Sequence, residues 1–273
     1  MTHAAETRNM ALFCDFENIA LGVRDANYAQ FDISKVMERL LLKGNIVVKK
    51  AYCDWSRYKE FRPAMHEASF ELIEIPHVRQ SGKNSADIRM VVDALDLCYT
   101  KGHVDTFVII SGDSDFSPLV SKLRENNRIV IGVGVKQSTS DLLIANCDEF
   151  IYYDDLVRPQ PPRGKPRPAA AAGKPGRGRA AKPALPAGDK KEEAWNLIVE
   201  TYEGLVKERG EGEKIWGSMV KQTLKRRKPG FNESYYGFRS FGEMLEEAKA
   251  HGILELEPDE KSGGFLIKNC RAP

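Results

Sequence analysis

Residues 10–155 alternate between short apolar runs and longer segments with helical periodicity. Several of the apolar runs are continuous, which is typical of central strands covered on both faces. Such alternation favours right-handed βαβ units, so the sequence predicts an α/β domain with a mostly parallel sheet flanked by helices. The expected strands are Met10–Phe16, Ile46–Cys53, Glu71–Val78, Thr106–Ser111, Arg128–Val135 and Glu149–Tyr153, and the expected helices are Ile33–Leu42, Arg57–Ser69, Ala86–Thr100 and Phe116–Asn126.

The charges of the chain are distributed unevenly. The net charge is −5 over residues 1–157, +7 over residues 158–189 and zero over residues 190–273. The middle segment also holds eight of the 14 prolines, among Ala, Gly, Lys and Arg, and it has too few apolar residues for a core. We therefore expect two domains, 1–157 and 190–273, joined by a disordered basic linker over 158–189 that attracts a polyanion.

The cellular setting is indicated by what the sequence omits. Five cysteines are scattered without Cys-x-x-Cys spacing, which favours reduced, partly buried thiols over a zinc site or disulfides. No apolar run approaches the ~18 residues of a membrane span, and residues 1–8 lack the apolar region of a signal peptide. We expect a soluble, cytoplasmic protein.

Acidic side chains follow two of the predicted strands. Asp113 and Asp115 lie in the SGDSDF segment that follows Thr106–Ile110, and Asp15 ends the first strand with Asn18 three residues later. The carboxyl ends of parallel strands open into a ligand crevice, so these groups can converge there. The alternative is that Asp15 and one of the later pair cap the helical turns that follow them.

A third acidic position lies at the start of a predicted helix. Asp87 is in line with the apolar face of that helix, where a carboxylate is costly unless a cation or donor faces it. The alternative is a first-turn placement that favours the helix dipole. Four carboxylates in one crevice would repel each other, and Mg²⁺ or Mn²⁺ with oxygen ligands would offset that repulsion. Such a cluster suits metal-assisted hydrolysis, with Ser111 donating to phosphate or orienting the carboxylates.

Three of these motifs together resemble the NYN domain, a family of PIN-like nucleases. They are Asp15-x-x-Asn18, the helix start Lys83-x-x-x-Asp87 and the Ser111–Leu119 segment, and the later CDEFI at Cys147–Ile151 is similar to the closing strand of the family. The resemblance covers about residues 8–155. It implies a Rossmann-like parallel sheet, a Mg²⁺ or Mn²⁺ site and endoribonuclease activity. Its acidic metal-binding positions map onto Asp15, Asp87, Asp113 and Asp115.

The C-terminal segment predicts a small winged-helix module. Its expected elements are helices over Glu192–Val206, Ile215–Arg227 and Phe238–Ala250, followed by a hairpin over Ile253–Glu257 and Gly264–Lys268. The segments Trp216–Gln222, Lys225–Phe231 and Tyr236–Phe241 resemble the OST-HTH (LOTUS) domain, which is implicated in binding RNA or RNA-associated proteins.

Cationic side chains gather at the end of the second of these helices. A dense cationic patch of this kind suits backbone phosphates, although a solvated helix end stabilised by its dipole is the alternative. The expected RNA-binding residues are Lys83, Lys221, Lys225, Arg226, Arg227 and Lys228.

These observations favour a metal-dependent endoribonuclease. In this hypothesis the four aspartates hold the metal, Asn18 and Ser111 support the geometry, and the linker and LOTUS module recruit RNA. The alternative is an RNA-binding regulator or adaptor with a weak or silent acidic pocket. An aspartyl-phosphate phosphohydrolase is disfavoured because its Asp-x-Asp motif usually follows the first strand, whereas the paired aspartates here follow the fourth.

Overall fold

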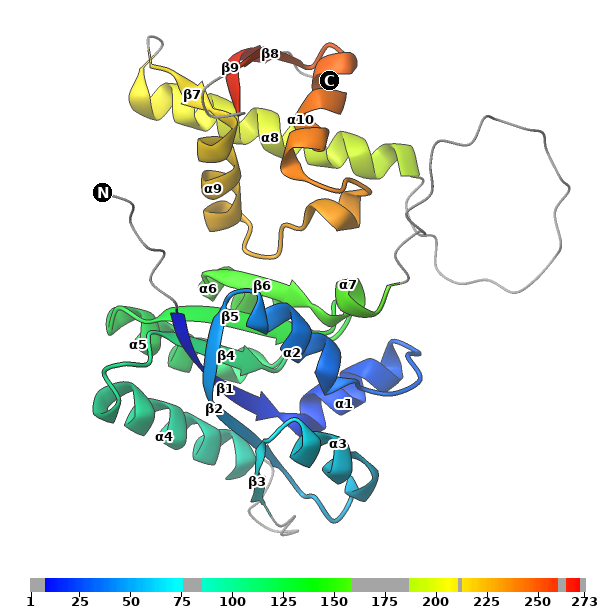
Figure 1. Cartoon of the computed structure of the whole chain (residues 1–273), viewed down its shortest axis with the longest axis vertical. Coiled ribbons are helices and arrows are strands. Elements are labelled where there is room, and N and C mark those ends of the chain that lie inside the picture. The colour runs from blue at the N-terminus through cyan, green and yellow to red at the C-terminus, as the bar shows by residue number, and fades with distance from the viewer. Residues whose placement is uncertain (1–7, 76–84, 159–186, 211–212, 260–263, 271–273) are drawn as a thin grey trace, which may run out of the picture. The chain divides into compact units, whose positions relative to one another are not determined.

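The computed structural model describes residues 8–75, 85–158, 187–210, 213–259 and 264–270 (Figure 1). The chain divides into two compact units. The elements up to Val157 belong to the first of them and are here called the N-terminal unit. Within the described ranges, no helix has both the length and the apolar character needed to cross a bilayer.

The N-terminal unit is built on one six-stranded sheet. Its strands run in the order β3–β2–β1–β4–β5–β6, and every pair of neighbours is parallel. This confirms the α/β class and the parallel sheet predicted from the apolar runs. The strands are β1 (Arg8–Asp15), β2 (Gly44–Cys53), β3 (Glu71–Glu74), β4 (Thr106–Ile110), β5 (Ile129–Gly134) and β6 (Glu149–Tyr152).

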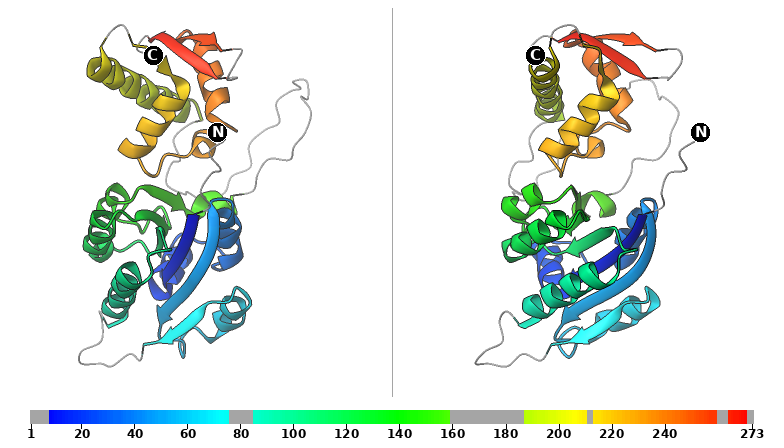
Figure 2. Two further views of the ribbon diagram at one scale, coloured as in Figure 1. Left: turned by 60° about the vertical axis from the view of Figure 1, so that its left-hand side comes forward. Right: turned by 90° about the vertical axis from the view of Figure 1, so that its left-hand side faces the viewer.

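Helices cover both faces of this sheet (Figure 2). β1 shows why: Met10, Leu12 and Cys14 are buried in the core on one face, while Ala11 and Phe13 are buried in the core on the other. A strand that is apolar on both faces needs a helical layer on each. The first layer holds α1 (Phe16–Asp25), α2 (Ile33–Leu41), α3 (Arg62–Glu67) and α7 (Tyr153–Val157), and the second holds α4 (Ser85–Thr100), α5 (Ser117–Glu125) and α6 (Asp141–Asn146).

The helices α1, α6 and α7 were not predicted. The signal for α1 was present, because Phe16, Ile19 and Val23 recur at helical spacing and all three are buried. The predicted helix over 57–69 was too long. The structure has a short 3₁₀ turn (Lys59–Phe61) before α3, with Pro63 in the first turn of α3, a position that proline favours.

The strand order creates a switch point between β1 and β4. From β1 the chain continues to β2 on one side, whereas β4 continues to β5 on the other. In open α/β sheets, ligands bind in the crevice at the carboxyl ends of the two strands that flank such a point. The residues at these ends are Asp15 on β1 and Ser111 directly after β4.

The C-terminal elements combine helices with a three-stranded antiparallel sheet of order β7–β9–β8, which fits a second small domain. The predicted hairpin is present as β8 and β9. Three helix starts differ from the prediction. α8 begins at Ala187 rather than Glu192. Ile215 and Trp216 pair with β9 as a strand before α9 begins, and α10 begins three residues later than predicted, where Ser240 caps it. The elements are α8 (Ala187–Arg209), β7 (Ile215–Trp216), α9 (Gly217–Arg227), α10 (Phe241–Ala250), β8 (Leu254–Pro258) and β9 (Phe265–Cys270).

Candidate acidic active site

Asp15 is the centre of the candidate site. Its residue exposure is only 7%, and no other Asp, Glu, Lys, Arg or His among the described residues is buried to this degree. The side chain accepts a hydrogen bond from Ser111 Oγ at 3.0 Å and one from the Asn18 backbone N–H at 3.4 Å. The second bond caps α1, so the capping role considered from the sequence is present. Capping alone does not require a buried carboxylate.

Two further hydrogen bonds fix the loop after β4, one of them to the start of α1. The Gly112 backbone N–H donates to Asn18 Oδ1 at 2.9 Å, and the Asp113 backbone N–H donates to Ser111 Oγ at 3.2 Å. Asn18 and Ser111 therefore both lie beside Asp15. Their observed contacts are with protein groups that hold the loop after β4 against the start of α1.

Gly112 is required by close packing of this loop. A Cβ atom at this position would lie 2.7 Å from the backbone oxygen of Ser138 and 3.0 Å from Thr139 Cα. Backbone atoms cannot move aside as the end of a flexible side chain can, so the loop itself would have to shift. The shift would disturb the Gly112–Asn18 hydrogen bond and the position of Asp113.

We expect the Gly112→Ala variant to fold with a lowered melting temperature and to lose about 1 to 3 kcal/mol of stability, the usual cost of overpacking. Thermal unfolding followed by circular dichroism measures this loss. Gly102→Ala is the matched control, because nothing lies within 4 Å of a Cβ at Gly102. Equal melting temperatures for the two variants would contradict the packing argument.

The loop after β4 places its two carboxylates differently. Asp113 is half-buried and accepts from the Asp115 backbone N–H at 2.9 Å, so it caps the short 3₁₀ turn Ser114–Phe116. Asp115 is exposed. The bond within the turn involves one oxygen of Asp113, so this cap is compatible with a further ligand at the other oxygen.

Asp87 completes the acidic group from the first turn of α4. Burial raises the pKa of Asp87, and the charges of Asp113, Asp115 and Glu17 raise it further. Burial and the nearby charge of Asp87 raise the pKa of Asp15 to about 7, against the lowering effect of its two hydrogen bonds. Asp113 adds a smaller effect of the same sign on Asp15. Asp87 is therefore coupled electrostatically to the other three predicted aspartates.

The four aspartates concentrate negative charge but do not form a complete set of metal ligands. Among the described residues, no three Asp, Glu, His or Cys side chains are arranged to ligate one ion together. Mg²⁺ commonly binds proteins through one or two carboxylates and keeps several waters, so an all-protein cage is not required. A set of clustered carboxylate oxygens, in which the pKa values of Asp15 and Asp87 are raised, fits a hard dication, whose charge would relieve the repulsion.

One further acidic residue was missed by the sequence interpretation. Glu17, on the first turn of α1, acts on Asp87 and forms an ion pair with Arg57 at 3.0 Å. Glu17 and Arg57 are far apart in the sequence, so the ion pair could not be predicted from local sequence. Glu17 does lie within the DFEN segment at Asp15–Asn18, in the first turn of α1, and this position could have suggested that it belongs to the acidic group.

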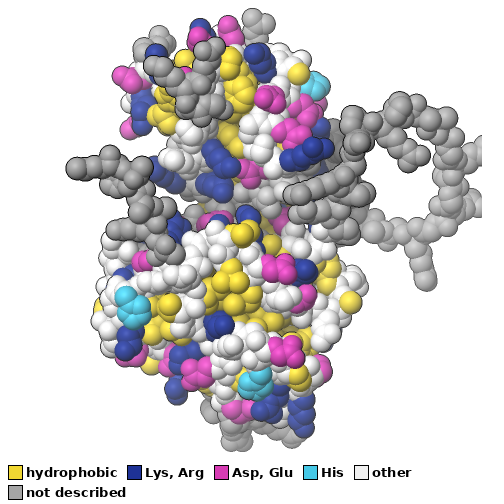
Figure 3. All heavy atoms as spheres, in the orientation of Figure 1, with side chains coloured by type: hydrophobic (Ala, Val, Ile, Leu, Met, Phe, Trp, Pro, Cys, Tyr) yellow, Lys and Arg dark blue, Asp and Glu magenta, His cyan; other side chains and the backbone are white. Residues whose placement is uncertain are grey.

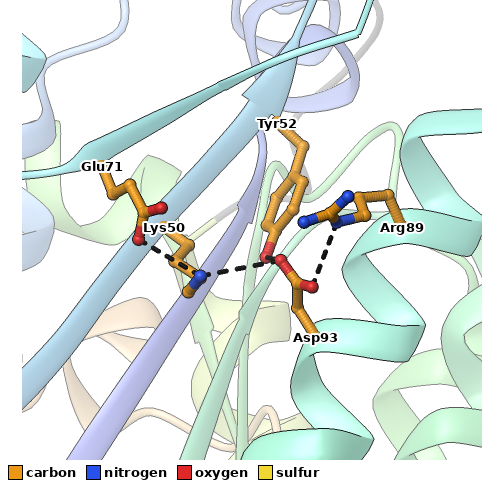
Figure 4. Close-up of polar contacts among 5 residues, drawn as sticks. All are labelled: Lys50, Tyr52, Glu71, Arg89 and Asp93. Carbon is orange, nitrogen blue, oxygen red and sulfur yellow. Dashed lines mark hydrogen bonds and ion pairs between the residues drawn. The ribbon is translucent and has the colours of Figure 1, made fainter.

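Asp93 belongs to a polar network between α4 and β2 (Figure 4). It accepts from Tyr52 Oη at 2.9 Å and from Arg89 Nε at 3.1 Å, and Lys50 Nζ lies 3.7 Å away. Its side chain is only 15% exposed, so Asp93 is not a solvated surface charge. Burial and the Asp93 hydrogen bond raise the pKa of Tyr52 well above its usual value. Because Tyr52 pairs with Asp15 in the sheet, this network links α4 to the strand beside Asp15.

The predicted RNA-binding residues are those on and just after α9, together with Lys83. Lys83 falls outside the described residues. α9 carries Lys221 and Lys225, its last turn carries Arg226 and Arg227, and Lys228 follows the end of the helix. The last three of these cations are exposed.

The predicted thiol state agrees with the structure. All five cysteines are free; Cys14, Cys53, Cys98 and Cys147 are buried and Cys270 is half-buried.

Comparison with known proteins identifies the family to which the chain belongs. The model of the NYN domain matches residues 9–154, which include β1 to β6 and all four aspartates. The chain belongs to the NYN domain family. That family includes nucleases of the PIN-like type.

Relatives of this NYN chain are distant. It is 25% identical to the Meiosis regulator and mRNA stability factor 1 of Xenopus tropicalis over 154 residues, covering 56% of this chain and 9% of the relative. It is 27% identical to an uncharacterized protein of Methanocaldococcus jannaschii, covering 44% of this chain and 49% of the relative. The match therefore spans less than half of either relative.

A solved structure shares the fold. The crystal structure of a protein of unknown function from Vibrio parahaemolyticus has a TM-score of 0.50 and 26% sequence identity, covering 57% of this chain and 98% of that chain.

Proposed function

We propose that this protein is a Mg²⁺- or Mn²⁺-dependent endoribonuclease. The observation that carries the proposal is the buried carboxylate of Asp15 at the β1–β4 switch point. The negative charges of Asp87 and Asp113 both raise its pKa. A fold gains nothing in stability from a desolvated carboxylate beside other carboxylates. Such groups persist at functional sites, where a ligand completes the charge balance.

In this proposal Asp15, Asp87, Asp113 and Asp115 hold the ion, directly or through water. A bound Mg²⁺ or Mn²⁺ would supply a water of lowered pKa and a positive charge beside the leaving oxygen. The protein's own part is positional: Ser111 and Asn18 hold the loop after β4 in place, and Asp113 keeps its orientation through the turn it caps. Without a cation, the acidic group would repel the phosphates of a nucleic acid.

RNA as the substrate class is supported by the family and by the charge pattern. One relative is named as an mRNA stability factor. Residues 158–189 carry a net charge of +7, and three exposed cations lie at the end of α9. In our proposal these basic segments bind backbone phosphates, and the C-terminal domain acts as a LOTUS module that recruits RNA or RNA-associated proteins.

The test is a cleavage assay on the full chain with end-labelled single-stranded RNA, duplex RNA and single-stranded DNA. We expect internal cutting of RNA that requires Mn²⁺ or Mg²⁺ and stops in EDTA. Undiminished cutting in EDTA would contradict the metal role, and preferential cutting of DNA would contradict the substrate class.

An RNA-binding adaptor is the second candidate. The observation that favours it is the lack, within the described residues, of three side chains arranged as one metal cage. A filter-binding assay beside the cleavage assay separates the two functions. Tight RNA binding without cutting at any divalent ion concentration would favour the adaptor.

A further inference from the structure

The outer face of α4 is apolar although it is exposed. Apolar side chains reach the surface of the N-terminal unit at several places, as the yellow atoms of Figure 3 show for one face. On α4 they are large and regularly spaced: Ile88 is 63% exposed, Val92 55% and Tyr99 64%. Leu95, which is half-buried, lies between Val92 and Tyr99. The four residues therefore follow one another at intervals of four, three and four. That spacing forms a continuous stripe along one face of a helix.

This stripe is not the face that packs on the sheet. The inward face of α4 is formed by Met90, Ala94 and Cys98, all of which are buried in the core. α4 therefore has a second apolar face beside the inward one, and this second face has no cover within the described part of the chain. Scattered exposed apolar residues are ordinary, whereas an ordered row of them indicates an interface.

The charges beside the stripe indicate what covers it. Arg89 and Asp96 lie seven residues apart on the same side of the stripe, at equivalent positions of a heptad whose core positions are the stripe residues. The Arg89 side chain is 58% exposed, and its contact with Asp93 uses only Nε, which leaves the terminal nitrogens free to donate. Asp96 is exposed as well. One edge of the stripe thus carries a cation at one end and an anion towards the other.

We propose that the α4 stripe is the interface of a homodimer in which the α4 helices of two copies pack antiparallel. Antiparallel packing about a two-fold axis brings equivalent flanking positions together in reversed order. Arg89 of each copy then faces Asp96 of the other, which makes two identical ion pairs. In a parallel pair these charges would instead face the other edge of the stripe, at Val91 and Cys98, which are apolar and turned towards the core.

The size of the interface sets its strength. A helix of 16 residues is about 24 Å long, and its stripe offers less than the roughly 800 Å² per partner of a standard interface. The dimer should therefore be reversible, with a concentration-dependent equilibrium in the micromolar range. This inference does not depend on the proposed nuclease function.

Sedimentation velocity of the full chain over a concentration series tests the proposal. We expect wild-type protein to shift from monomer to dimer, and Val92→Glu to weaken association at least tenfold. Leu42→Glu is the matched control, because Leu42 is 79% exposed but lies next to α2 rather than α4. Circular dichroism and the melting temperature establish that each variant is folded. A wild-type protein that stays monomeric throughout, or a Val92→Glu variant that dimerises like wild type, would overturn the proposal.

A charge exchange tests the antiparallel geometry. Asp96→Arg alone and Arg89→Asp alone should each lose self-association, because each copy would meet like charges in its partner. An equimolar mixture of the two variants should recover wild-type association, because both contacts are then between opposite charges. A mixture no better than either variant alone would overturn the antiparallel arrangement. Association seen only when RNA is added would show that the stripe is not a self-interface.

Discussion

Replacing Asp15 by Asn should make the metal-free protein more stable at neutral and alkaline pH. In the folded chain the pKa of Asp15 is raised from 3.8 to about 7, by burial first and then by the charge of Asp87. Between these two values the unfolded chain is ionised while the folded chain holds the proton, so wild-type stability falls as the pH rises from about 4 through 7. The difference corresponds to about 4 kcal/mol at pH 8.

The Asn variant escapes this loss because its side chain does not ionise. Its amide oxygen can accept from the Asn18 N–H, and its amide nitrogen can donate to Ser111 Oγ, so the hydrogen bonds are retained in number. Urea unfolding in EDTA at pH 4, 6 and 8 measures the effect. We expect a steep fall in the free energy of unfolding for wild type and a smaller fall for Asp15→Asn, in which the raised pKa of Asp87 remains. Asp141→Asn, at an exposed position on α6, is the control and should follow wild type.

Divalent cations should also change the free energy of unfolding. An ion that binds only the folded state stabilises it by mass action, so Mn²⁺ should restore wild-type stability at pH 8 and should have little effect on Asp15→Asn. A wild-type protein whose stability does not change between pH 5 and 8 in EDTA would show that Asp15 is not the strained group described here.

Replacing Asp113 by Asn should reduce RNA cleavage by at least about 100-fold while the fold is retained. Asparagine caps helical turns as well as aspartate does, so the bond from the Asp115 N–H survives. What is lost is one negative charge from the acidic group and one oxygen that can bind a cation. Loss of even an indirect partner of a metal typically costs 10- to 100-fold, and loss of a direct ligand costs more.

Single-turnover cleavage of labelled RNA at several Mn²⁺ concentrations measures this effect, with Asp141→Asn again as the control. An unchanged melting temperature establishes that the turn after β4 is intact. Full activity of Asp113→Asn, together with insensitivity to EDTA, would rule out the acidic group as the catalytic centre.

Much of the fold was predictable because its signals are local. Runs such as Thr106–Ile110 are apolar on both faces, and a strand of that kind requires helices on either side. The aspartates of the candidate site were predictable for the same reason, since each follows a strand or begins a helix and the ends of parallel strands meet. The short helices α6 and α7 were missed, because six and five residues carry too little periodicity to be distinguished from turns.

What the sequence by itself determined is the set of elements and the positions of the acidic residues at their ends. Only the tertiary structure decided how those residues act on one another. The burial that raises the pKa of Asp15, the approach of Glu17 to Asp87 and the bond from Tyr52 to Asp93 all join groups that are not neighbours in sequence. The physical reason is that periodicity records which face of an element is buried, whereas electrostatic energy depends on distances through space, which exist only once the strands are placed in order.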